Sequence, residues 1–241
     1  MPCWISWATT PAKLACMPAQ SANPLRIDRT SKTLRELSLE KMRGAILGAH
    51  FKPGERLVER NLCEQLDVSR SIVREVLRHL EAEGLVESIP HHGPVVATLS
   101  AEQAAQIYDI RALLEGRAAR LFAQRASDEQ IEQLVALNSS IQKAFKAAEV
   151  ESVVQRTESF YEALFVGAGM EMAWDVVQSL NARINRLRLL TVGSKGRQKD
   201  AAAEMEAILK ALRKRDSQAA QDAAEAHVHK VAALANKLLA A

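Results

Sequence analysis

The sequence has few of the residues that build packed sheets, disulfide scaffolds or membrane spans. Aromatic residues make up only 4% of the chain whereas alanine is abundant, and this balance favours helices packed on helices. Its three cysteines, Cys3, Cys16 and Cys63, are an odd number without a Cys-x-x-Cys pair, which argues against a disulfide framework or a zinc knuckle and fits a reducing compartment. No run reaches the roughly 18 uninterrupted apolar residues that a spanning helix needs, so we expect a cytoplasmic protein without a membrane partner.

The sequence also lacks a strong excess of charge of one sign. The net charge is +3; residues 1–99 carry 13 Lys and Arg against 11 Asp and Glu, and residues 100–241 carry 19 against 18. Neither half is a polycation, so binding to nucleic acid has to depend on where particular arginines lie.

Motifs of the common enzyme classes are missing as well. The chain contains no Gly-x-Ser-x-Gly nucleophile elbow, no phosphate-binding loop, no dinucleotide fingerprint and no His-Glu-x-x-His helix. Its acidic residues are scattered along polar faces rather than paired among apolar ones. We therefore expect no enzymatic activity and no catalytic residues.

Residues 1–33 show neither a helical nor a strand period and contain four prolines. Lys13 interrupts the middle of the segment instead of preceding an apolar run, which is not the order of a signal peptide. We predict a disordered N-terminal arm. An alternative is that these residues precede a true start at Met17.

Residues 34–99 have the pattern of three helices followed by a hairpin. The helices are expected over Thr33–Ala49, Glu59–Leu66 and Ser69–Glu83, with a tight connection between the second and the third. Two short β-prone runs then lie between Val86 and Leu99, on either side of the turn signal His-His-Gly-Pro. This order is typical of a winged helix-turn-helix.

From residue 100 onward the strand signal stops and long helices begin. Ser100 and Ser127 each start a Ser-x-x-Gln capping box, in which the hydroxyl and the amide side chain satisfy each other's free backbone amides. Four more helices are expected over about Glu151–Phe165, Glu171–Leu190, Asp200–Lys214 and Asp216–Leu239. The predicted fold class is therefore mainly α, a winged helix-turn-helix at 34–99 followed by an all-helical bundle at 100–241.

Three arginines lie along one face of the third predicted helix. Arg70, Arg74 and Arg78 are spaced i, i+4, i+8, where like charges repel, and Arg70 sits at the positive end of the helix dipole. Both penalties become attractions if the partner is a polyanion, and arginine can read guanine through two parallel hydrogen bonds in the major groove. A solvated face with glutamates nearby explains the stripe alone equally well, but the elements on either side favour DNA.

A set of motifs runs through this region: Pro53-Gly54-Glu55-Arg56-Leu57, Glu59-Arg60, Ser69-Arg70-Ser71-Ile72-Val73-Arg74-Glu75-Val76-Leu77 and Glu83-Gly84-Leu85-Val86, with Gly93 in the wing. Together they resemble the DNA-binding domain of the bacterial GntR family. The resemblance implies DNA contacts by arginines, by hydroxyl groups and by the tip of the wing, at Arg60, Ser69, Arg70, Ser71, Arg74, His92 and Gly93. An alternative is that His91 and His92 only form the turn.

The next segment, Tyr108-Asp109-Ile110-Arg111-Ala112-Leu113-Leu114-Glu115 followed by Ala118-Ala119-Arg120-Leu121, resembles the first helix of the FCD effector domain. That resemblance extends to about Val231. It implies a bundle of six or seven helices that dimerises on a pseudo-palindromic operator and binds a small metabolite, such as an organic or sugar acid. The expected function is that of a transcriptional regulator, with repression as the expected action. The alternative is an architectural or protein-binding module without an effector.

Many members of this branch hold a divalent metal with an Asp, a His four residues later and two further histidines. The first two positions align with Thr157 and Tyr161, the third with Met205 after Glu204, and only the last, His227, keeps its histidine. Too few suitable donors remain for a divalent ion, so we expect no metal and no other cofactor.

Without a metal, a bound carboxylate needs another cation. Arg111 and Arg183 lie among apolar residues on helices that the resemblance places around the cavity, although a surface salt bridge explains each of them equally well. We therefore expect an effector site formed by Arg111, Thr157, Tyr161, Arg183, Met205 and His227. The alternative for the histidine is a core residue hydrogen-bonded to the tyrosine or to the backbone.

Overall fold

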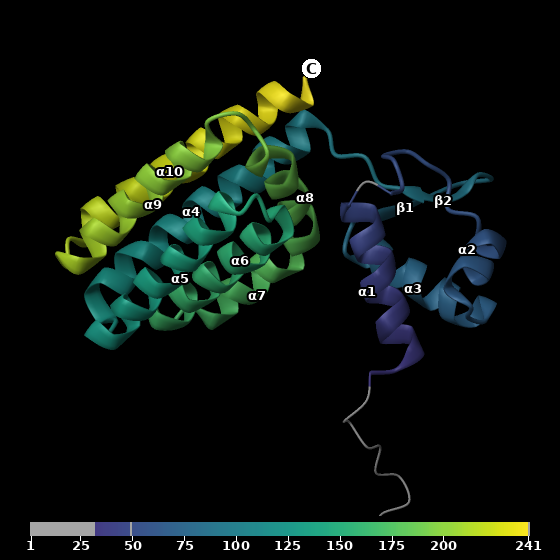
Figure 1. Cartoon of the computed structure of the whole chain (residues 1–241), viewed down its shortest axis with the longest axis horizontal. Coiled ribbons are helices and arrows are strands. Elements are labelled where there is room, and N and C mark those ends of the chain that lie inside the picture. Colours follow the sequence, from purple (N-terminus) through teal and green to yellow (C-terminus); the bar gives the residue numbers. More distant parts are fainter. Residues whose placement is uncertain (1–31, 49, 241) are drawn as a thin grey trace, which may run out of the picture. The chain divides into compact units, whose positions relative to one another are not determined.

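A computed structural model describes residues 32–48 and 50–240. Nearly all of the predicted N-terminal arm lies outside the described residues. The described residues form ten helices and one two-stranded sheet (Figure 1). None of these helices combines the length and the apolar character that crossing a membrane requires.

The first part of the described chain is a winged helix-turn-helix, as the sequence predicts. It comprises α1 (Leu34–Leu47), α2 (Glu59–Leu66), α3 (Arg70–Ala82), β1 (Val86–Ile89) and β2 (Gly93–Val96).

The tight turn of this motif depends on two residues between α2 and α3. Asp67 adopts the left-handed conformation (φ 51°, ψ 48°), which reverses the chain directly after α2. Ser69 is the N-cap of α3, and its hydroxyl accepts a hydrogen bond from the Ile72 N–H at 3.4 Å. The side chains that α3 buries against the rest of the domain are Val73, Val76, Leu77 and Leu80.

The hairpin pairs Val86 with Val96 and Ile89 with Gly93 in antiparallel register. Gly93 has φ 88°, a conformation that favours glycine. A feature that the sequence pattern does not predict is a short third segment: Arg56 forms an isolated antiparallel bridge with Val95. This bridge ties the chain before α2 to the wing, so the wing is attached on both sides.

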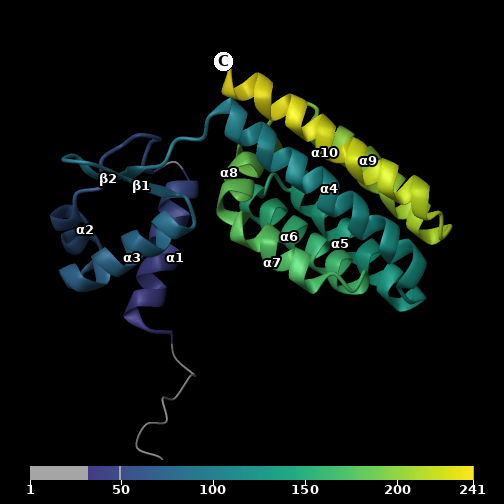
Figure 2. The ribbon, with the colours of Figure 1, turned by 180° about the vertical axis from the view of Figure 1, so that it is seen from behind.

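The second part of the described chain is a bundle of seven helices, within the range that the family resemblance implies. It comprises α4 (Ala101–Arg125), α5 (Asp128–Lys146), α6 (Val150–Gly167), α7 (Glu171–Ser179), α8 (Asn181–Val192), α9 (Arg197–Arg213) and α10 (Ser217–Leu239). Both predicted capping boxes are present, at Ser100 and Ser127. Within the bundle α10 runs alongside α4 in the opposite direction, and α9 lies next to α10 (Figure 2).

The prediction of a single helix over residues 171–190 is wrong, because the structure has two helices there. They meet at Leu180, whose N–H bonds to the Val177 carbonyl in a tighter turn than that of an α-helix. The Ser179 hydroxyl donates to the Val176 carbonyl at 2.6 Å. The apolar period continues across the break, and neither proline nor glycine marks it, so the pattern does not reveal it.

The same substitution at two helical glycines should have opposite effects on stability. A Cβ on Gly167, at the end of α6, would lie 2.4 Å from the ring of the fully buried Phe122. Gly167→Ala should therefore lower the free energy of unfolding by about 1–3 kcal/mol. Gly44 in α1 has nothing within 4 Å of such a Cβ, so Gly44→Ala should raise it by about 0.4–1 kcal/mol. Urea unfolding followed by circular dichroism tests both, and a Gly167→Ala variant as stable as the parent would contradict the packing described here.

Candidate functional site

The polar face of the helix-turn-helix carries the residues that the sequence predicts as DNA contacts. Arg70, Ser71 and Arg74 are exposed along α3, and Arg60 is exposed on the neighbouring α2. Ser69 is exposed at the N-terminus of α3, where its hydroxyl already accepts the capping hydrogen bond.

Two of these arginines have carboxylate partners in the free protein. Arg74 Nε donates to both carboxylate oxygens of Glu59 at 3.0 Å, and Arg60 Nε donates to Glu64 at 3.2 Å. The four side chains are 30% to 80% exposed. Exposed ion pairs of this kind contribute at most about 1 kcal/mol, so a phosphate or a base edge can replace the carboxylate at small cost.

The tip of the wing presents His91 and His92, which are both exposed. His91 has φ 63°, and the His92 N–H closes the turn by donating to the Ile89 carbonyl at 3.0 Å. Gly93 follows with its left-handed backbone. The two histidines therefore form the turn, and the same turn presents their side chains to solvent.

A second site is a small cavity inside the bundle, with a volume of about 50 Å³. Residues from α4, α5, α6, α8, α9 and α10 line it. The apolar lining is Ile141, Phe145, Val153, Val192, Ala201, Met205 and Val231, and the polar lining is Arg111, Thr157, Arg188, Thr191, Arg197 and His227. Three guanidinium groups around so small a space are the outstanding feature of this cavity.

Arg111 and Glu115 form a buried ion pair one turn apart on α4. The distances are 2.7 Å from Nε to Oε1 and 3.3 Å from Nη2 to Oε2, and the side chains are 3% and 1% exposed. Burial opposes the charge of Arg111, but Glu115 together with Tyr161 and Tyr108 outweighs burial, so the pKa of the guanidinium is raised. The guanidinium also lies over the rings of Tyr108 and Tyr161, at 5.5 and 5.8 Å from their centroids.

Arg197, Glu204 and His227 form a second buried group, which joins α9 to α10. Glu204 Oε2 accepts from Arg197 Nη1 at 2.8 Å and lies 2.8 Å from His227 Nδ1. Burial opposes the charge of Glu204, but its two partners lower the pKa of this carboxyl overall. Burial, assisted by the positive charge of Arg197, also lowers the pKa of His227, so the imidazole is neutral near pH 7.

Arg188 on α8 has no carboxylate partner within 4 Å among the described residues. Its Nη1 donates to Asn185 Oδ1 at 2.9 Å, and its Nε is buried without any hydrogen-bond partner in the described part of the chain. The guanidinium lies 5.6 Å from the centroid of the Tyr161 ring. Burial, and then repulsion by Arg111, lowers the pKa of Arg188 to about 10, so it remains charged at neutral pH.

The structure brings most of the predicted effector residues together, with one exception. Arg111, Thr157, Met205 and His227 line the cavity, and Tyr161 is buried beside its arginines. Arg183 does not line the cavity, because it lies off the buried face of α8. His227 is not hydrogen-bonded to Tyr161, which is one of the partners that the sequence analysis considers. The partner of the His227 side chain is the carboxylate of Glu204.

Sequence reasoning missed Arg188, Arg197 and Glu204. The signal for Arg188 was present: it lies at helical spacing with the buried Ile184, Leu187 and Thr191. No comparable signal exists for the other two, since Arg197 follows a glycine-containing loop and Glu204 finds its partners only in the folded bundle.

The side chains at the expected metal positions do not fit a divalent ion. Thr157 donates its hydroxyl to the Val153 carbonyl at 2.7 Å, and His227 is engaged by Glu204. Burial raises the pKa of Tyr161, so no phenolate is available near neutral pH. In the described chain no three His, Cys, Asp or Glu side chains are grouped as metal ligands. The lining guanidinium groups would also repel a cation.

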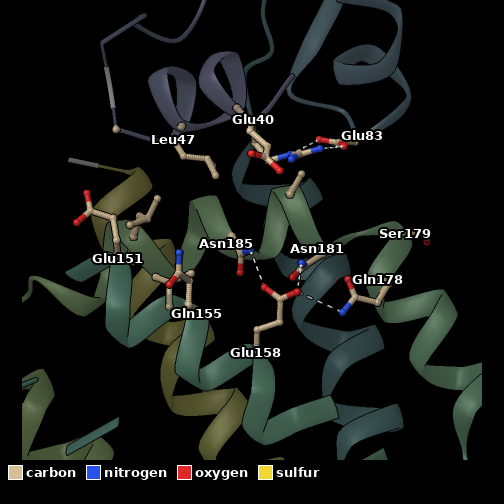
Figure 3. A pocket seen from close by; sticks show the side chains of 16 residues that line it. Glu40, Leu47, Glu83, Glu151, Gln155, Glu158, Gln178, Ser179, Asn181 and Asn185 are labelled. Carbon is tan, nitrogen blue, oxygen red and sulfur yellow. Dashed lines mark hydrogen bonds and ion pairs between the residues drawn. The ribbon is translucent and has the colours of Figure 1, made fainter. Parts of the chain in front are cut away.

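A larger cleft of about 520 Å³ is lined by residues of α1, α6, α7 and α8 (Figure 3). In this cleft the Glu158 carboxylate accepts hydrogen bonds from Asn181, Asn185 and Gln178 at 2.7, 3.4 and 3.3 Å. Three further glutamates line this cleft and only one arginine does. This acidic lining disfavours an anion. Three amide groups already donate hydrogen bonds to the Glu158 carboxylate, so it does not require a ligand as a partner.

Comparison with known proteins assigns both parts of the chain. A model of the gntR family of bacterial regulatory proteins matches residues 39–96, and a model of the FCD domain matches residues 106–230, more than half of the chain. Residues 97–105 lie between the two matches.

Several relatives are named as transcriptional regulators. The HTH-type regulator YdhC of Bacillus subtilis is 29% identical over 190 residues, which cover 78% of this chain and 84% of the relative. The Nta operon transcriptional regulator of Aminobacter aminovorans is 33% identical over 141 residues, covering 58% and 66%. The repressor RspR of Escherichia coli is 26% identical over 190 residues, covering 79% and 83%.

Two solved structures share the fold. Escherichia coli McbR superposes with a TM-score of 0.69 at 20% identity, covering 86% of this chain and 99% of the other. A GntR regulator from Rhodococcus sp. RHA1 gives a TM-score of 0.71 at 20% identity, covering 86% and 98%.

The chain has a helix-turn-helix whose second helix carries arginines, followed by a helical domain with an internal cavity. Together these features define a DNA-binding regulator of transcription. The chain belongs to the GntR family of bacterial regulators and carries an FCD domain.

Replacing Arg74 should weaken binding to the operator and relax its sequence preference. If Arg74 reads a base edge, Arg74→Ala should cost about 1–3 kcal/mol, and part of the remaining affinity should fall with added salt. The operator is obtained by selection from a random DNA library with the full-length protein, and affinities are measured by fluorescence anisotropy. Arg213→Ala, at an exposed ion-paired arginine of α9, is the matched control and should change nothing. Equal affinity and selectivity of the Arg74 variant and the parent would remove Arg74 from the DNA contacts.

Proposed function

We propose that this protein is a metabolite-controlled regulator, acting as a repressor in the cytoplasm, whose affinity for operator DNA changes when a small molecule binds in the cavity of the FCD bundle. The observation that carries the proposal is the cavity itself: a largely apolar space within the bundle, with a few convergent polar groups, is the usual form of a small-molecule site. Repressor action is supported by the relative RspR, which is named a transcriptional repressor.

The composition of the lining supports an effector rather than a purely structural role. A bundle held together only by its core gains nothing from burying a guanidinium without a carboxylate partner, because an unpaired buried charge is costly. Arg188 is buried in this way at the wall of the cavity. A ligand that supplies the missing partner explains why such a group is present.

Filling the cavity should uncouple the effector from the DNA without harming DNA binding. Met205 lines the cavity and is 3% exposed, so Met205→Phe should occupy part of the space that the ligand needs. The selected operator is titrated with the full-length protein while a panel of organic acids, sugar acids, amino acids and acyl thioesters is screened for changes in affinity. We expect one class of compound to change the operator affinity at least about tenfold, a coupling typical of allosteric regulators.

The matched control is Met172→Phe, because Met172 is 79% exposed on α7. Met205→Phe should keep the parent's operator affinity and lose the response, and Met172→Phe should keep both. If no compound in the panel alters operator binding, or if Met205→Phe responds like the parent, the proposed control by this cavity is wrong.

We also propose that the protein binds its operator as a homodimer. One winged domain contacts only a few base pairs, and two-fold symmetry doubles the contacts on a pseudo-palindromic site. Leu113 and Ile110 on α4 are 71% and 38% exposed, and they offer an apolar surface to a second copy.

Light scattering at micromolar concentration should give twice the chain mass of 26.5 kDa, and Leu113→Glu should shift the mass toward the monomer. Met172→Glu, at a similarly exposed apolar residue, should leave the dimer intact. A monomer mass for the parent both with and without operator DNA would contradict the dimer.

A further inference from the structure

A very short stretch of chain joins the winged domain to the bundle. The Ala97 N–H still bonds to the Leu85 carbonyl of the winged domain at 2.9 Å, and Leu99 already packs on the apolar core of the bundle. Only Thr98 lies between these two attachments. The connection therefore limits how far the two domains can separate, but its backbone bonds still allow one domain to turn relative to the other.

Helix α8 attaches the winged domain to the bundle a second time. The Arg186 guanidinium donates from Nη1 to the Ala97 carbonyl. Arg183, one turn earlier on the same face of α8, lies against Gly84, and the neighbouring Ala182 packs on the apolar core of the winged domain. Because the contacts at Gly84 and Ala182 join the domains at points other than the covalent connection, they restrain rotation about it.

The absence of a side chain at Gly84 lets Arg183 come this close. Gly84 has φ 72°, a conformation that favours glycine, and a Cβ at this position would overlap the Arg183 guanidinium. Gly84 directly follows the C-cap of α3, the helix that carries the predicted DNA contacts Arg70 and Arg74. The dipole of a helix favours a cation at this end. Arg183 therefore holds the C-terminal end of the helix that is predicted to read DNA.

The surfaces that meet at α8 are complementary in charge. A crevice of about 360 Å³ is lined by Arg183 and Arg186 from α8 and by Glu81 and Glu87 from the winged domain. The winged domain contributes no lysine or arginine to this lining. Opposite charges on facing surfaces favour one relative orientation and disfavour others.

The opposite face of α8 is fixed in the bundle. Ile184, Leu187 and Thr191 are buried there, and the Thr191 hydroxyl donates to the Leu187 carbonyl at 3.1 Å. A helix with one face packed in a core is a rigid support, because close-packed interiors yield little. The two arginines on its other face can therefore hold the winged domain in a defined orientation.

The orientation of the winged domain determines which operators a dimer can bind. Each α3 of a two-fold dimer must enter the major groove of its own half-site. DNA completes a turn in 10–10.5 base pairs and 34–36 Å, so each base pair added between the half-sites separates them by about 3.4 Å and rotates them by about 35°. Winged domains that are held in one orientation fit one spacing, whereas winged domains that turn freely fit several.

We propose that Arg183 and Arg186 are positioning residues that set the spacing between the operator half-sites. They hold the end of α3 and the chain leaving the wing in one orientation on α8. The inference rests on the proposed homodimer, and it gives neither residue a contact with DNA. Loss of the two arginines should therefore change the preferred spacing and leave the reading of bases within each half-site unchanged.

The spacing preference is measured with the full-length protein. The selected operator and four derivatives, whose centre is shortened or lengthened by one or two base pairs, are titrated by fluorescence anisotropy. The parent should bind its best spacing at least about tenfold more tightly than the neighbouring ones, because a displaced half-site loses base contacts. In Arg183→Ala/Arg186→Ala this ratio should fall to about threefold or less. Affinity for the best spacing should fall about 3- to 10-fold, because the winged domains are no longer pre-organised.

Matched variants separate positioning from a general loss of charge. Lys210→Ala/Arg213→Ala removes two positive charges from exposed positions on α9 and should keep the parent's ratio. Arg186→Lys keeps a donor for the Ala97 carbonyl, so it should retain more of the spacing preference than Arg186→Met, which keeps the length without a donor. Changing one base pair within a half-site should cost every variant the same factor in affinity as the parent.

Failure of the inference differs from failure of the dimer. If Arg183→Ala/Arg186→Ala keeps the parent's ratio, or if the dimeric parent binds all five spacings equally, the inference is wrong and the dimer stands. A change in base selectivity within the half-site would show that the arginines support the fold of the winged domain, and it would also overturn the inference. A parent that binds a single half-site as a monomer in light scattering would overturn the dimer and the inference together.

Discussion

Charge buried at the centre of the bundle is the constraint on which the arrangement of its helices depends. Arg111 and Glu115 satisfy each other along α4, and the Arg197–Glu204–His227 group joins α9 to α10. Because breaking a buried pair costs far more than breaking an exposed one, the Glu204–His227 contact helps to fix how α9 faces α10, and the Arg111–Glu115 pair satisfies two charges that α4 buries. The small cavity is the space that remains between the two groups.

The protein uses arginine in two opposite ways. On α2 and α3 the guanidinium groups are exposed, and they hold carboxylates that a phosphate can replace at little cost. Inside the bundle, Arg111 and Arg197 are instead buried with a buried carboxylate partner each, and Arg188 is buried without one. The difference is one of solvent access rather than of residue type, and it explains why net charge says so little about function here: neither half of the chain carries a large excess.

The fold follows from the sequence wherever the signal is local. Ser69, Ser100 and Ser127 mark helix starts through their own hydroxyl groups, and helical spacing identifies the buried face of α3. The break at Leu180 escaped prediction because the apolar period runs through it. The bridge of Arg56 to Val95 escaped because a single paired residue leaves no alternating pattern.

The cavity was only partly predictable, for a related reason. Positions such as Thr157 and Met205 could be placed by alignment with a known pattern, whereas the pairing of Arg197 with Glu204 depends on how α9 folds back toward α10. The sequence analysis named Arg183 and overlooked Arg188, although both lie among apolar residues in the sequence. Only the register of α8, with Ile184 and Leu187 inward, distinguishes them.

A ligand site built on a buried arginine is controlled differently from one built on a metal ion. A metal site depends on deprotonated ligands and on metal supply, so its affinity for a ligand varies with both. The pKa of Arg188 is lowered only to about 10, so its charge is constant through the physiological range. His227, whose pKa is lowered by burial, does not gain a proton near neutral pH either. The positive charge of this cavity is therefore a fixed property of the folded chain, and it is available to an anion whenever the bundle is intact.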